Sequence, residues 1–261
     1  MTRLLDVRDV HVSFGGVDAL DGVSCHLDAG EIVGLMGPNG AGKTTLLNVI
    51  SGIVRPQRGA VLFDGVDIGS APPQERARQG LARTLQGVDL FRRLSVRETL
   101  MLTAQLSQER PRPGAAEPAP AAHRVRGAAE NLGLDTDLDR FVGELPGGRQ
   151  RLVDIAAALC LRPRCLLLDE PAAGSGAEES ARLGRSLLRI REKLGVGILL
   201  VEHDVQLVFD VADYVYVLDF GRLIAAGTPA EVRRDPAVVA AYLGQETAAE
   251  TPVREVVHAA H

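Results

Sequence analysis

The run Gly37-Pro38-Asn39-Gly40-Ala41-Gly42-Lys43-Thr44 decides the fold of this chain. A short apolar stretch over 32–36 precedes it and a helical pattern over 44–51 follows it, so the run predicts a turn between a buried strand and a helix. Its three glycines let backbone N–H groups surround an anion without a side-chain clash. The helix that follows points its N-terminus at the same anion. The run therefore predicts a phosphate-binding loop.

Two side chains of this loop carry the chemistry. We expect Lys43 to bring a compact positive charge to the β- and γ-phosphates of a nucleotide, and Thr44 to offer its hydroxyl to Mg²⁺. The chain contains only two lysines, which disfavours the alternative of an ordinary glycine-rich turn. The residues expected to bind the nucleotide here are Gly37, Pro38, Asn39, Gly40, Ala41, Gly42, Lys43, Thr44 and Thr45.

Two acidic residues end a second apolar run, Cys165-Leu166-Leu167-Leu168-Asp169-Glu170. Ligands of open α/β sheets lie at the carboxyl ends of the strands, so we expect Asp169 near Thr44, holding Mg²⁺ directly or through water. Glu170, one residue further, is suited to polarise an attacking water. An exposed turn is the alternative for such a strand end. A phosphate-binding loop earlier in the chain favours the functional interpretation.

The remaining patterns predict alternating strands and helices. Short antiparallel strands are expected over 4–30, and a proline-rich loop over 107–122. Buried strands that alternate with helices favour an α/β fold with a mostly parallel sheet. The segment from Gln245 onward has little apolar content and predicts disorder. The other expected elements are helices over 95–106, 123–134, 150–161, 178–194 and 205–211, strands over 165–168 and 196–201, and a hairpin of 214–218 with 223–225.

Composition limits the class of protein. Hydrophobic residues make up 46% of the chain and charged residues 24%, which is typical of a soluble globular domain. The net charge of −5 disfavours nucleic acid as the main partner. No apolar run reaches the roughly 18–20 residues that span a bilayer, and the N-terminus does not resemble a signal peptide. Cys25, Cys160 and Cys165 lack metal or redox spacing and are expected to be buried thiols.

With these features the sequence resembles the ATP-binding subunits of ABC transporters over residues 3–244. The resemblance implies an α/β fold with a P-loop NTPase core, an antiparallel N-terminal β-subdomain and a helical subdomain at about 88–160. One ABC ATPase domain would cover 1–244, with a tail over 245–261. The resemblance also implies ATP and Mg²⁺ as cofactors, and hydrolysis of ATP with Lys43, Glu170 and His203 as catalytic residues.

Three further positions match motifs of this family. Phe14, in Ser13-Phe14-Gly15-Gly16, matches the aromatic residue that stacks on adenine, an ordinary core phenylalanine being the alternative. Gln86 matches the glutamine that links Mg²⁺ and water to the membrane partner. His203, in Val201-Glu202-His203-Asp204, matches the histidine that contacts the γ-phosphate and positions the glutamate. The expected magnesium ligands are therefore Thr44, Gln86 and Asp169.

Two motifs depart from the family pattern. The signature loop, which in the family reads Leu-Ser-Gly-Gly-Gln and caps the ATP of the opposite subunit, here comprises Leu145, Pro146, Gly147, Gly148 and Arg149. Pro146 removes a hydroxyl donor and Arg149 replaces the glutamine, which puts the support of hydrolysis at the partner's site in doubt. Gly176 stands where the loop after the catalytic glutamate usually ends in Asp or Asn.

Several segments are similar to the ATPases of branched-chain amino-acid importers. They are 170–174, 202–204, 219–222 and the ending over 227–244. This similarity implies a subunit that energises uptake of branched-chain amino acids or related small polar solutes. The ATPase of lipopolysaccharide exporters shares part of the ending, and importers of urea or short amides share the branch, so both remain alternatives.

The family likeness also implies an assembly on the inner, cytoplasmic face of the plasma membrane. One phosphate loop and one signature loop per chain imply a second ATPase subunit placed head to tail. Family importers commonly pair two different ATPase chains, so we expect a heterodimer in the cell, with a homodimer as the alternative for the isolated chain. Two transmembrane permease subunits and an external solute-binding protein would complete the complex, without nucleic acid.

Two functions of other classes stay open. A soluble ABC protein acting on DNA or ribosomes would need a basic surface or long inserted coiled coils, and the sequence contains neither. A non-catalytic regulatory module is disfavoured by Glu170 and His203. The acidic run over 135–139 imitates the start of a calcium-binding loop, but Arg140 stands where glycine is required, so we expect no calcium there.

Overall fold

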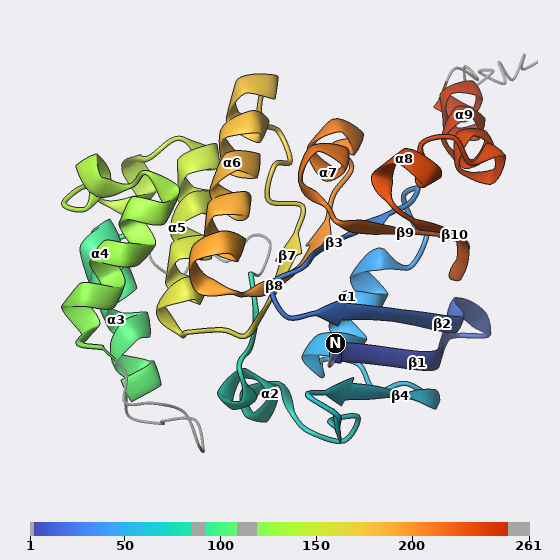
Figure 1. The fold of residues 1–261 in the computed structure, drawn as a ribbon, viewed down its shortest axis with the longest axis horizontal. Helices are drawn as coiled ribbons and strands as arrows, with labels where there is room; N and C mark the ends of the chain where they lie inside the picture. Colours follow the sequence, from blue (N-terminus) through green and yellow to red (C-terminus); the bar gives the residue numbers. More distant parts are fainter. Residues whose placement is uncertain (1–2, 85–91, 109–118, 250–261) are drawn as a thin grey trace, which may run out of the picture.

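The computed structural model describes residues 3–84, 92–108 and 119–249. Two sheets and the helices that cover them make up this part of the chain (Figure 1). The elements are β1 (Arg3–Phe14), β2 (Val17–Asp28), β3 (Ile32–Met36), α1 (Lys43–Ser51), β4 (Arg58–Phe63), β5 (Val66–Asp67), α2 (Pro73–Gln79), β6 (Leu81–Arg83), α3 (Val96–Gln108), α4 (Ala121–Leu132), η1 (Asp135–Asp137), η2 (Val142–Glu144), α5 (Gly147–Cys160), β7 (Cys165–Asp169), α6 (Ala177–Leu194), β8 (Gly197–Val201), α7 (Val205–Val211), β9 (Tyr214–Asp219), β10 (Arg222–Gly227), α8 (Pro229–Val232) and α9 (Pro236–Ala249).

The larger sheet has the strand order β10-β9-β3-β8-β7-β6 in the described part of the chain. The strands from β9 to β6 pair in parallel, and β10 returns as an antiparallel hairpin partner of β9. The smaller sheet, β2-β1-β4-β5, is antiparallel. The predicted α/β fold with a mostly parallel sheet and an antiparallel N-terminal sheet is confirmed.

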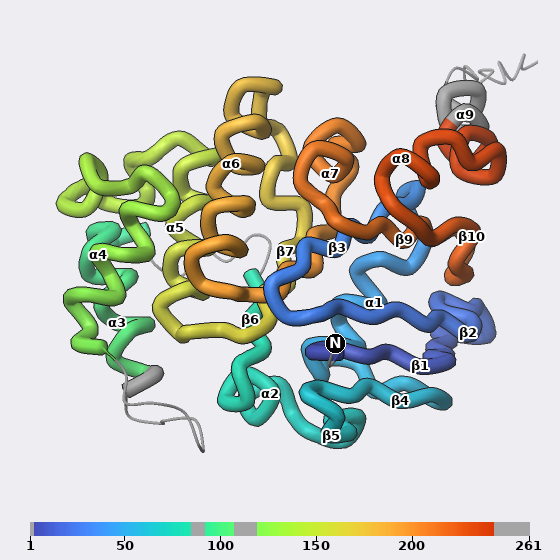
Figure 2. The backbone as a smooth tube through the Cα atoms, in the orientation of Figure 1, coloured from blue at the N-terminus to red at the C-terminus, as the bar shows by residue number. Residues whose placement is uncertain are grey.

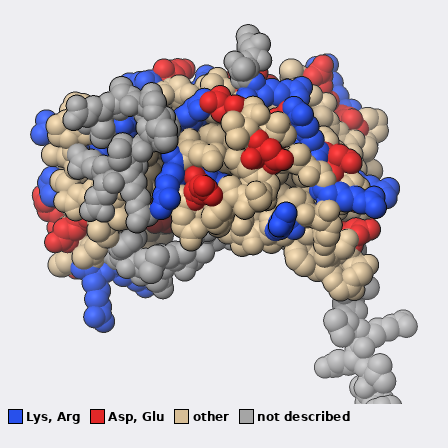
Figure 3. Space-filling model, turned by 90° about the horizontal axis from the view of Figure 1, so that it is seen from below, with Lys and Arg blue, Asp and Glu red and all other residues tan. Residues whose placement is uncertain are grey.

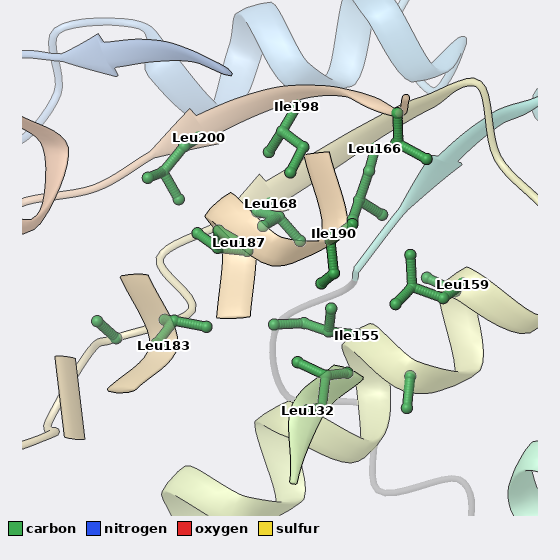
Figure 4. Packing of buried hydrophobic residues seen from close by; sticks show 14 of the residues in the cluster. Leu132, Ile155, Leu159, Leu166, Leu168, Leu183, Leu187, Ile190, Ile198 and Leu200 are labelled. Atoms are coloured by element: carbon green, nitrogen blue, oxygen red, sulfur yellow. The ribbon is translucent and has the colours of Figure 1, made fainter. Parts of the chain in front are cut away.

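The central strands separate two cores, although almost all of their residues are apolar. Leu166 and Leu168 of β7 lie in one buried cluster, whereas Cys165 and Leu167 lie in the other, because successive side chains of a strand point to opposite faces. On the first face they meet α6, α5 and α4, through residues such as Leu187 (Figure 4). Each fully buried leucine contributes roughly 1.5–3 kcal/mol of hydrophobic stabilisation. The second cluster lies between the two sheets and includes α1.

The helices α3, α4 and α5 lie at one end of the molecule, away from β1, β2 and β4 (Figure 2). They pack on one another through Val96, Leu100, Val125, Ala129 and Ile155, which belong to the first cluster. This packing does not cover the carboxyl ends of β3, β7 and β8, which carry the loops that follow those strands. Parallel-sheet proteins bind ligands at such strand ends. All three cysteines lie in described segments, and each is buried outside any disulfide, as predicted. In the described segments no helix has the length and apolar character needed to cross a membrane.

Some predicted boundaries are wrong. The N-terminal strands β1 and β2 are 12 residues long each, because bulges let the pairing continue through irregular positions that suggested breaks. Helix α3 extends to Gln108 and α4 begins at Ala121, so the predicted loop over 107–122 is too long at both ends. Residues 109–118 lie outside the described chain.

The predicted tail from Gln245 onward overlaps the last described helix. Helix α9 continues to Ala249, five residues past the predicted domain end at 244. The helix is anchored by Val238, which is buried in the main core. The rest of the predicted tail, 250–261, lies outside the described residues.

Candidate functional site

The phosphate loop connects β3 to α1, as the sequence predicts, and its glycines are required by close backbone approaches. A Cβ on Gly37, which has φ of 147°, would lie 2.1 Å from the carbonyl oxygen of Leu218. A Cβ on Gly42, with φ of 104°, would lie 2.5 Å from the carbonyl oxygen of Ala19. Any larger residue at either place would push the loop away from the β9 end or from the β2 strand.

Lys43 lies in the first turn of α1 with only 6% of its surface exposed. Its ammonium donates to the carbonyl oxygens of Gly37 at 2.7 Å and Pro38 at 2.8 Å. Burial lowers the pKa of Lys43, and the carboxylates of Glu170 and Asp169 act in the opposite direction. The positive charge is thus held inside the loop beside two acidic groups.

A cavity of ≈190 Å³ opens over this loop. Asn39, Lys43 and Thr45 line it from one side, and Glu170 and His203 from the other. Glu170 and His203 therefore meet most of the phosphate loop at one place, although they come from the ends of β7 and β8, whereas the predicted residues Gly37, Pro38 and Asp169 do not line this cavity. The full lining is Ala19, Asn39, Gly40, Ala41, Gly42, Lys43, Thr44, Thr45, Glu170 and His203.

Glu170 and His203 form a hydrogen-bonded pair at the mouth of this cavity. The Nε2 atom of His203 lies 2.9 Å from Oε1 of Glu170. Glu170 adopts a left-handed backbone with φ of 48°, and its N–H donates to the carbonyl of Val201 at 2.9 Å. Strain of this kind persists only where surrounding contacts enforce it, and it is commonly found at active sites. In this arrangement the carboxylate can accept a proton from water, and the imidazole can orient the carboxylate.

Asp169 is buried at the end of β7 and is paired with a residue that the sequence did not single out. The Nη2 atom of Arg83 donates to Oδ2 of Asp169 at 2.9 Å. The Nη1 atom of the same guanidinium donates to Asn48 at 2.7 Å and Ser51 at 3.1 Å. Arg83 thereby ties the aspartate to α1, the helix that begins at Lys43. Arg83 lies next to the motif that contains Gln86. This position is the one feature of the sequence that pointed to Arg83.

Glu202 is a second residue that the sequence interpretation left without a role. It is 2% exposed, and its carboxylate accepts from the backbone N–H of Ala172 at 2.6 Å and of His203 at 3.1 Å. Burial raises the pKa of Glu202, whereas hydrogen bonds from Ala172, Asp204 and His203 lower it. The carboxylate joins the loop after Glu170 to the loop that holds His203. The sequence feature that could have indicated a role for Glu202 is an acidic residue at the end of an otherwise apolar strand.

The donor set at the loop fits a magnesium ion. Thr44 has an exposed side chain, Asp169 presents a carboxylate whose Oδ1 atom is not the one bonded to Arg83, and both offer the hard oxygen atoms that Mg²⁺ prefers. The third predicted ligand, Gln86, lies outside the described residues. Phe14 is 53% exposed at the end of β1, in the β1–β2 turn, and does not line the cavity, whereas Ala19 of the same hairpin does.

The signature loop lies apart from this cavity. Pro146 precedes α5 as its N-cap, and Gly147 is its first residue. Pro146, Gly148 and Arg149 line a different cavity of ≈440 Å³ beside α6. The Arg149 guanidinium pairs with Asp137 and donates to the carbonyl of Gly133 at 2.7 Å, so it is engaged within its own chain.

Two other sequence features can be placed. Gly176, in extended conformation, is the N-cap of α6 without a side-chain hydrogen bond. Asp137, from the run that imitates a calcium loop, pairs with Arg140 and Arg149. The described residues contain no cluster of three His, Cys, Asp or Glu side chains that could hold a metal ion.

Comparison with known families decides the identity of this site. The model of the ABC transporter family matches residues 20–173, which include the phosphate loop and Glu170. The chain belongs to the ABC transporter ATP-binding family. It is an ABC ATPase, and the resemblance noted in the sequence is confirmed. A second model, of branched-chain amino acid ATP-binding cassette transporters, matches residues 222–248.

The relatives of this ABC ATPase include proteins of two transport classes. The high-affinity branched-chain amino acid transport ATP-binding protein of Pseudomonas aeruginosa is 35% identical over 250 residues, covering 93% of this chain and 98% of the relative. The protein of the same description in Escherichia coli is 36% identical with the same coverage. The lipopolysaccharide export system ATP-binding protein of Escherichia coli is 34% identical over 242 residues, again with 93% and 98% covered.

Solved structures show the same fold. An ATP-binding cassette of an ABC transporter in its ADP conformation is 31% identical, covers 94% of this chain and 100% of its own, and superposes with a TM-score of 0.83. A nucleotide-free cassette gives 31% identity and a TM-score of 0.81, with 92% and 98% covered.

Proposed function

We propose that this ABC ATPase is the ATP-hydrolysing subunit of an importer for branched-chain amino acids or related small polar solutes. The observation that carries the catalytic part is the Glu170–His203 pair, 2.9 Å apart, on the cavity that the phosphate loop lines. The solute class is supported by the segment over 222–248 and by the branched-chain amino acid transport relatives.

In this proposal the loop from Gly37 to Thr45 binds the phosphates of ATP through its backbone N–H groups. Lys43 would exchange the carbonyls of Gly37 and Pro38 for the β- and γ-phosphates, and Thr44, Asp169 and Gln86 would hold Mg²⁺. A bound Mg²⁺ would supply charge neutralisation at the β- and γ-phosphate oxygens. Phe14 stacks on the adenine.

Glu170 takes the proton of the attacking water in this mechanism. His203 orients the carboxylate through Nε2 and lies on the same cavity as the phosphate loop, where it can contact the γ-phosphate. Glu202, which is buried, fixes the backbone of His203, and Arg83, which is half-buried, fixes Asp169, so each of these two site residues is held by a neighbouring side chain.

The proposed assembly follows from the separation of the two loops. Pro146, Gly147, Gly148 and Arg149 do not line the cavity of their own chain's phosphate loop. A second ATPase subunit, head to tail, would bring its signature loop to that cavity. We place the pair on the cytoplasmic face of the plasma membrane, bound to two transmembrane permeases that work with an external solute-binding protein.

Export of lipopolysaccharide is the alternative within the family, since the Escherichia coli export ATPase covers 93% of this chain at 34% identity. A role on nucleic acid has less support. On the face that Figure 3 shows, basic and acidic side chains lie interspersed, and the net charge of the chain is −5. The described residues of that face offer no continuous basic stripe to a phosphate backbone.

Uptake of labelled leucine, valine and isoleucine tests this function, in cells that lack the gene and are complemented with wild type or with Glu170→Gln. Labelled urea serves as the control solute. We expect wild type alone to restore uptake of the amino acids. Uptake that does not depend on the gene would refute amino-acid import and favour another solute or export, and it would leave the ATPase assignment intact.

A further inference from the structure

The C-terminal helix α9 reaches the first residue of the phosphate loop. The backbone N–H of Gly37 donates to the hydroxyl oxygen of Tyr242 at 3.0 Å, across a sequence separation of 205 residues. Tyr242 lies in the segment over 222–248 that matches the branched-chain transporter model. The contact therefore joins that segment directly to the nucleotide-binding loop.

Both backbone polar groups of Gly37 are occupied by side chains that come from different elements. Its N–H is bound by Tyr242, and its carbonyl accepts from the Lys43 ammonium at 2.7 Å. The Cα position is closed off by the carbonyl of Leu218, which a Cβ would approach to 2.1 Å. Tyr242 of α9 thus holds the Met36–Gly37 peptide, Lys43 of α1 holds the Gly37–Pro38 peptide, and the end of β9 closes the space beside the Gly37 Cα between them.

The helix that carries Tyr242 is firmly attached to the body of the protein. Val238, one turn earlier, is 6% exposed, and the Tyr242 ring packs against the same core. The preceding helix α8 is held by the Arg233 guanidinium, 4.8 Å from the centre of the Phe209 ring. Burial raises the pKa of Tyr242, so its hydroxyl stays neutral across the physiological pH range.

A second contact links the same C-terminal region to the other end of the loop. The N–H of Gly221, in the β9–β10 turn, donates to the carbonyl of Ala41 at 3.0 Å, and its carbonyl accepts from Asp21 at 2.8 Å. The loop is therefore held at Gly37 by α9 and at Ala41 by the β9–β10 turn. Between these points lie residues whose N–H groups would face phosphate.

We propose that Tyr242 is a positioning residue for nucleotide binding, which holds the start of the phosphate loop in its binding conformation. Without the hydroxyl, the Met36–Gly37 peptide can rotate, and part of the loop must be ordered when nucleotide binds. That ordering lowers affinity, because a loop fixed beforehand loses less conformational freedom on binding. The ordinary alternative is a contact that only docks α9, and it predicts lower stability with unchanged affinity.

The test compares Tyr242→Phe with Tyr216→Phe in the full-length chain. Both substitutions keep the ring and remove one hydroxyl. The Tyr216 hydroxyl lies 3.0 Å from Nδ1 of His26 on β2, and no contact of it reaches the phosphate loop among the described residues. The dissociation constant of Mg²⁺–ADP is measured by calorimetry, and kcat and KM for ATP are measured alongside the melting temperature.

We expect Tyr242→Phe to weaken ADP binding by roughly 2- to 10-fold relative to Tyr216→Phe, the effect of one neutral hydrogen bond. KM for ATP should rise by a similar factor, and kcat at saturating ATP should stay within about twofold of wild type. This result is expected when the bound substrate and the transition state lose the same binding free energy. Affinity within twofold of Tyr216→Phe, whatever the melting temperature, would overturn the proposal. So would a fall in kcat with unchanged KM.

Discussion

At the residue scale, the end of β8 carries two side chains with separate tasks. His203 faces the cavity and meets Glu170, whereas Glu202 points inward and binds backbone N–H groups of two loops. Removing a buried acceptor that binds backbone N–H groups is costly. Each N–H left without a partner has lost its hydrogen bond to water and gains none within the protein.

The substitution Glu202→Gln tests this arrangement. The amide NH₂ of glutamine would face a backbone N–H, so one buried donor at Ala172 or His203 would lose its acceptor. We expect the free energy of unfolding to fall by roughly 1–3 kcal/mol in urea denaturation at neutral pH. Glu192→Gln, on the exposed face of α6, is the matched control and should change it by less than about 0.5 kcal/mol. Equal effects of the two substitutions would contradict the account.

At this scale the sequence predicts a candidate site where a motif is local. The phosphate loop and the strand-end acids Asp169 and Glu170 lie in continuous runs whose chemistry can be interpreted directly. Arg83, Glu202 and Tyr242 could not be found in this way, since their partners are 86, 30 and 205 residues distant along the chain. Only the folded sheet brings those pairs together.

At the element scale, α7 begins directly after the loop that holds His203 and has a defined N-cap. The Asp204 carboxylate accepts from the N–H of Leu207 at 3.1 Å and satisfies one of the amides that the first turn leaves unpaired. Because Asp204 follows His203, this cap also fixes the point at which the chain leaves the site.

The pair Asp204→Ala and Asp204→Asn tests the cap. Alanine removes the acceptor and should lower the free energy of unfolding by about 1 kcal/mol, whereas asparagine keeps an oxygen acceptor and should lower it much less. Thermal or urea unfolding of the three proteins measures the difference. An alanine variant as stable as the asparagine variant would show that the cap contributes nothing.

Long amphipathic helices were predictable because their hydrophobic period is strong, and the buried strands because they form short continuous apolar runs. The short elements were not. Helix α2 has 7 residues and owes its place to Arg76, whose guanidinium donates to the last carbonyls of α1 at Val49 and Ile50. Strand β6, with three residues, exists through its pairing with β7. Contacts of this kind leave no periodic pattern in the sequence.

At the scale of the whole molecule, each chain is expected to be half of a composite site. The phosphate loop and the signature loop line different cavities of one chain. Two inactive variants should therefore complement each other when mixed. Lys43→Ala removes the phosphate contact, and Gly147→Asp introduces a bulky anion into the signature loop, where a Cβ at Gly147 would meet no atom of its own chain within 4 Å.

We expect each variant alone to be inactive and the mixture to hydrolyse ATP, because one site of the mixed dimer combines an intact phosphate loop with an intact signature loop. Turnover is measured over a range of protein concentrations, and mixing either variant with itself is the control. A mixture as inactive as its components, at concentrations where wild-type turnover per chain has reached its maximum, would contradict a shared site.

The central claim, that Glu170 activates water at a nucleotide bound by the phosphate loop, is tested most directly by Glu170→Gln. ATP binding and ATP turnover are measured on the same preparation, with Glu178→Gln, an exposed substitution at the start of α6, as the control. The account predicts ATP affinity within about twofold of wild type and a loss of turnover of roughly 100-fold or more, since general-base catalysis contributes at least that factor. Turnover at the wild-type rate in Glu170→Gln would contradict it.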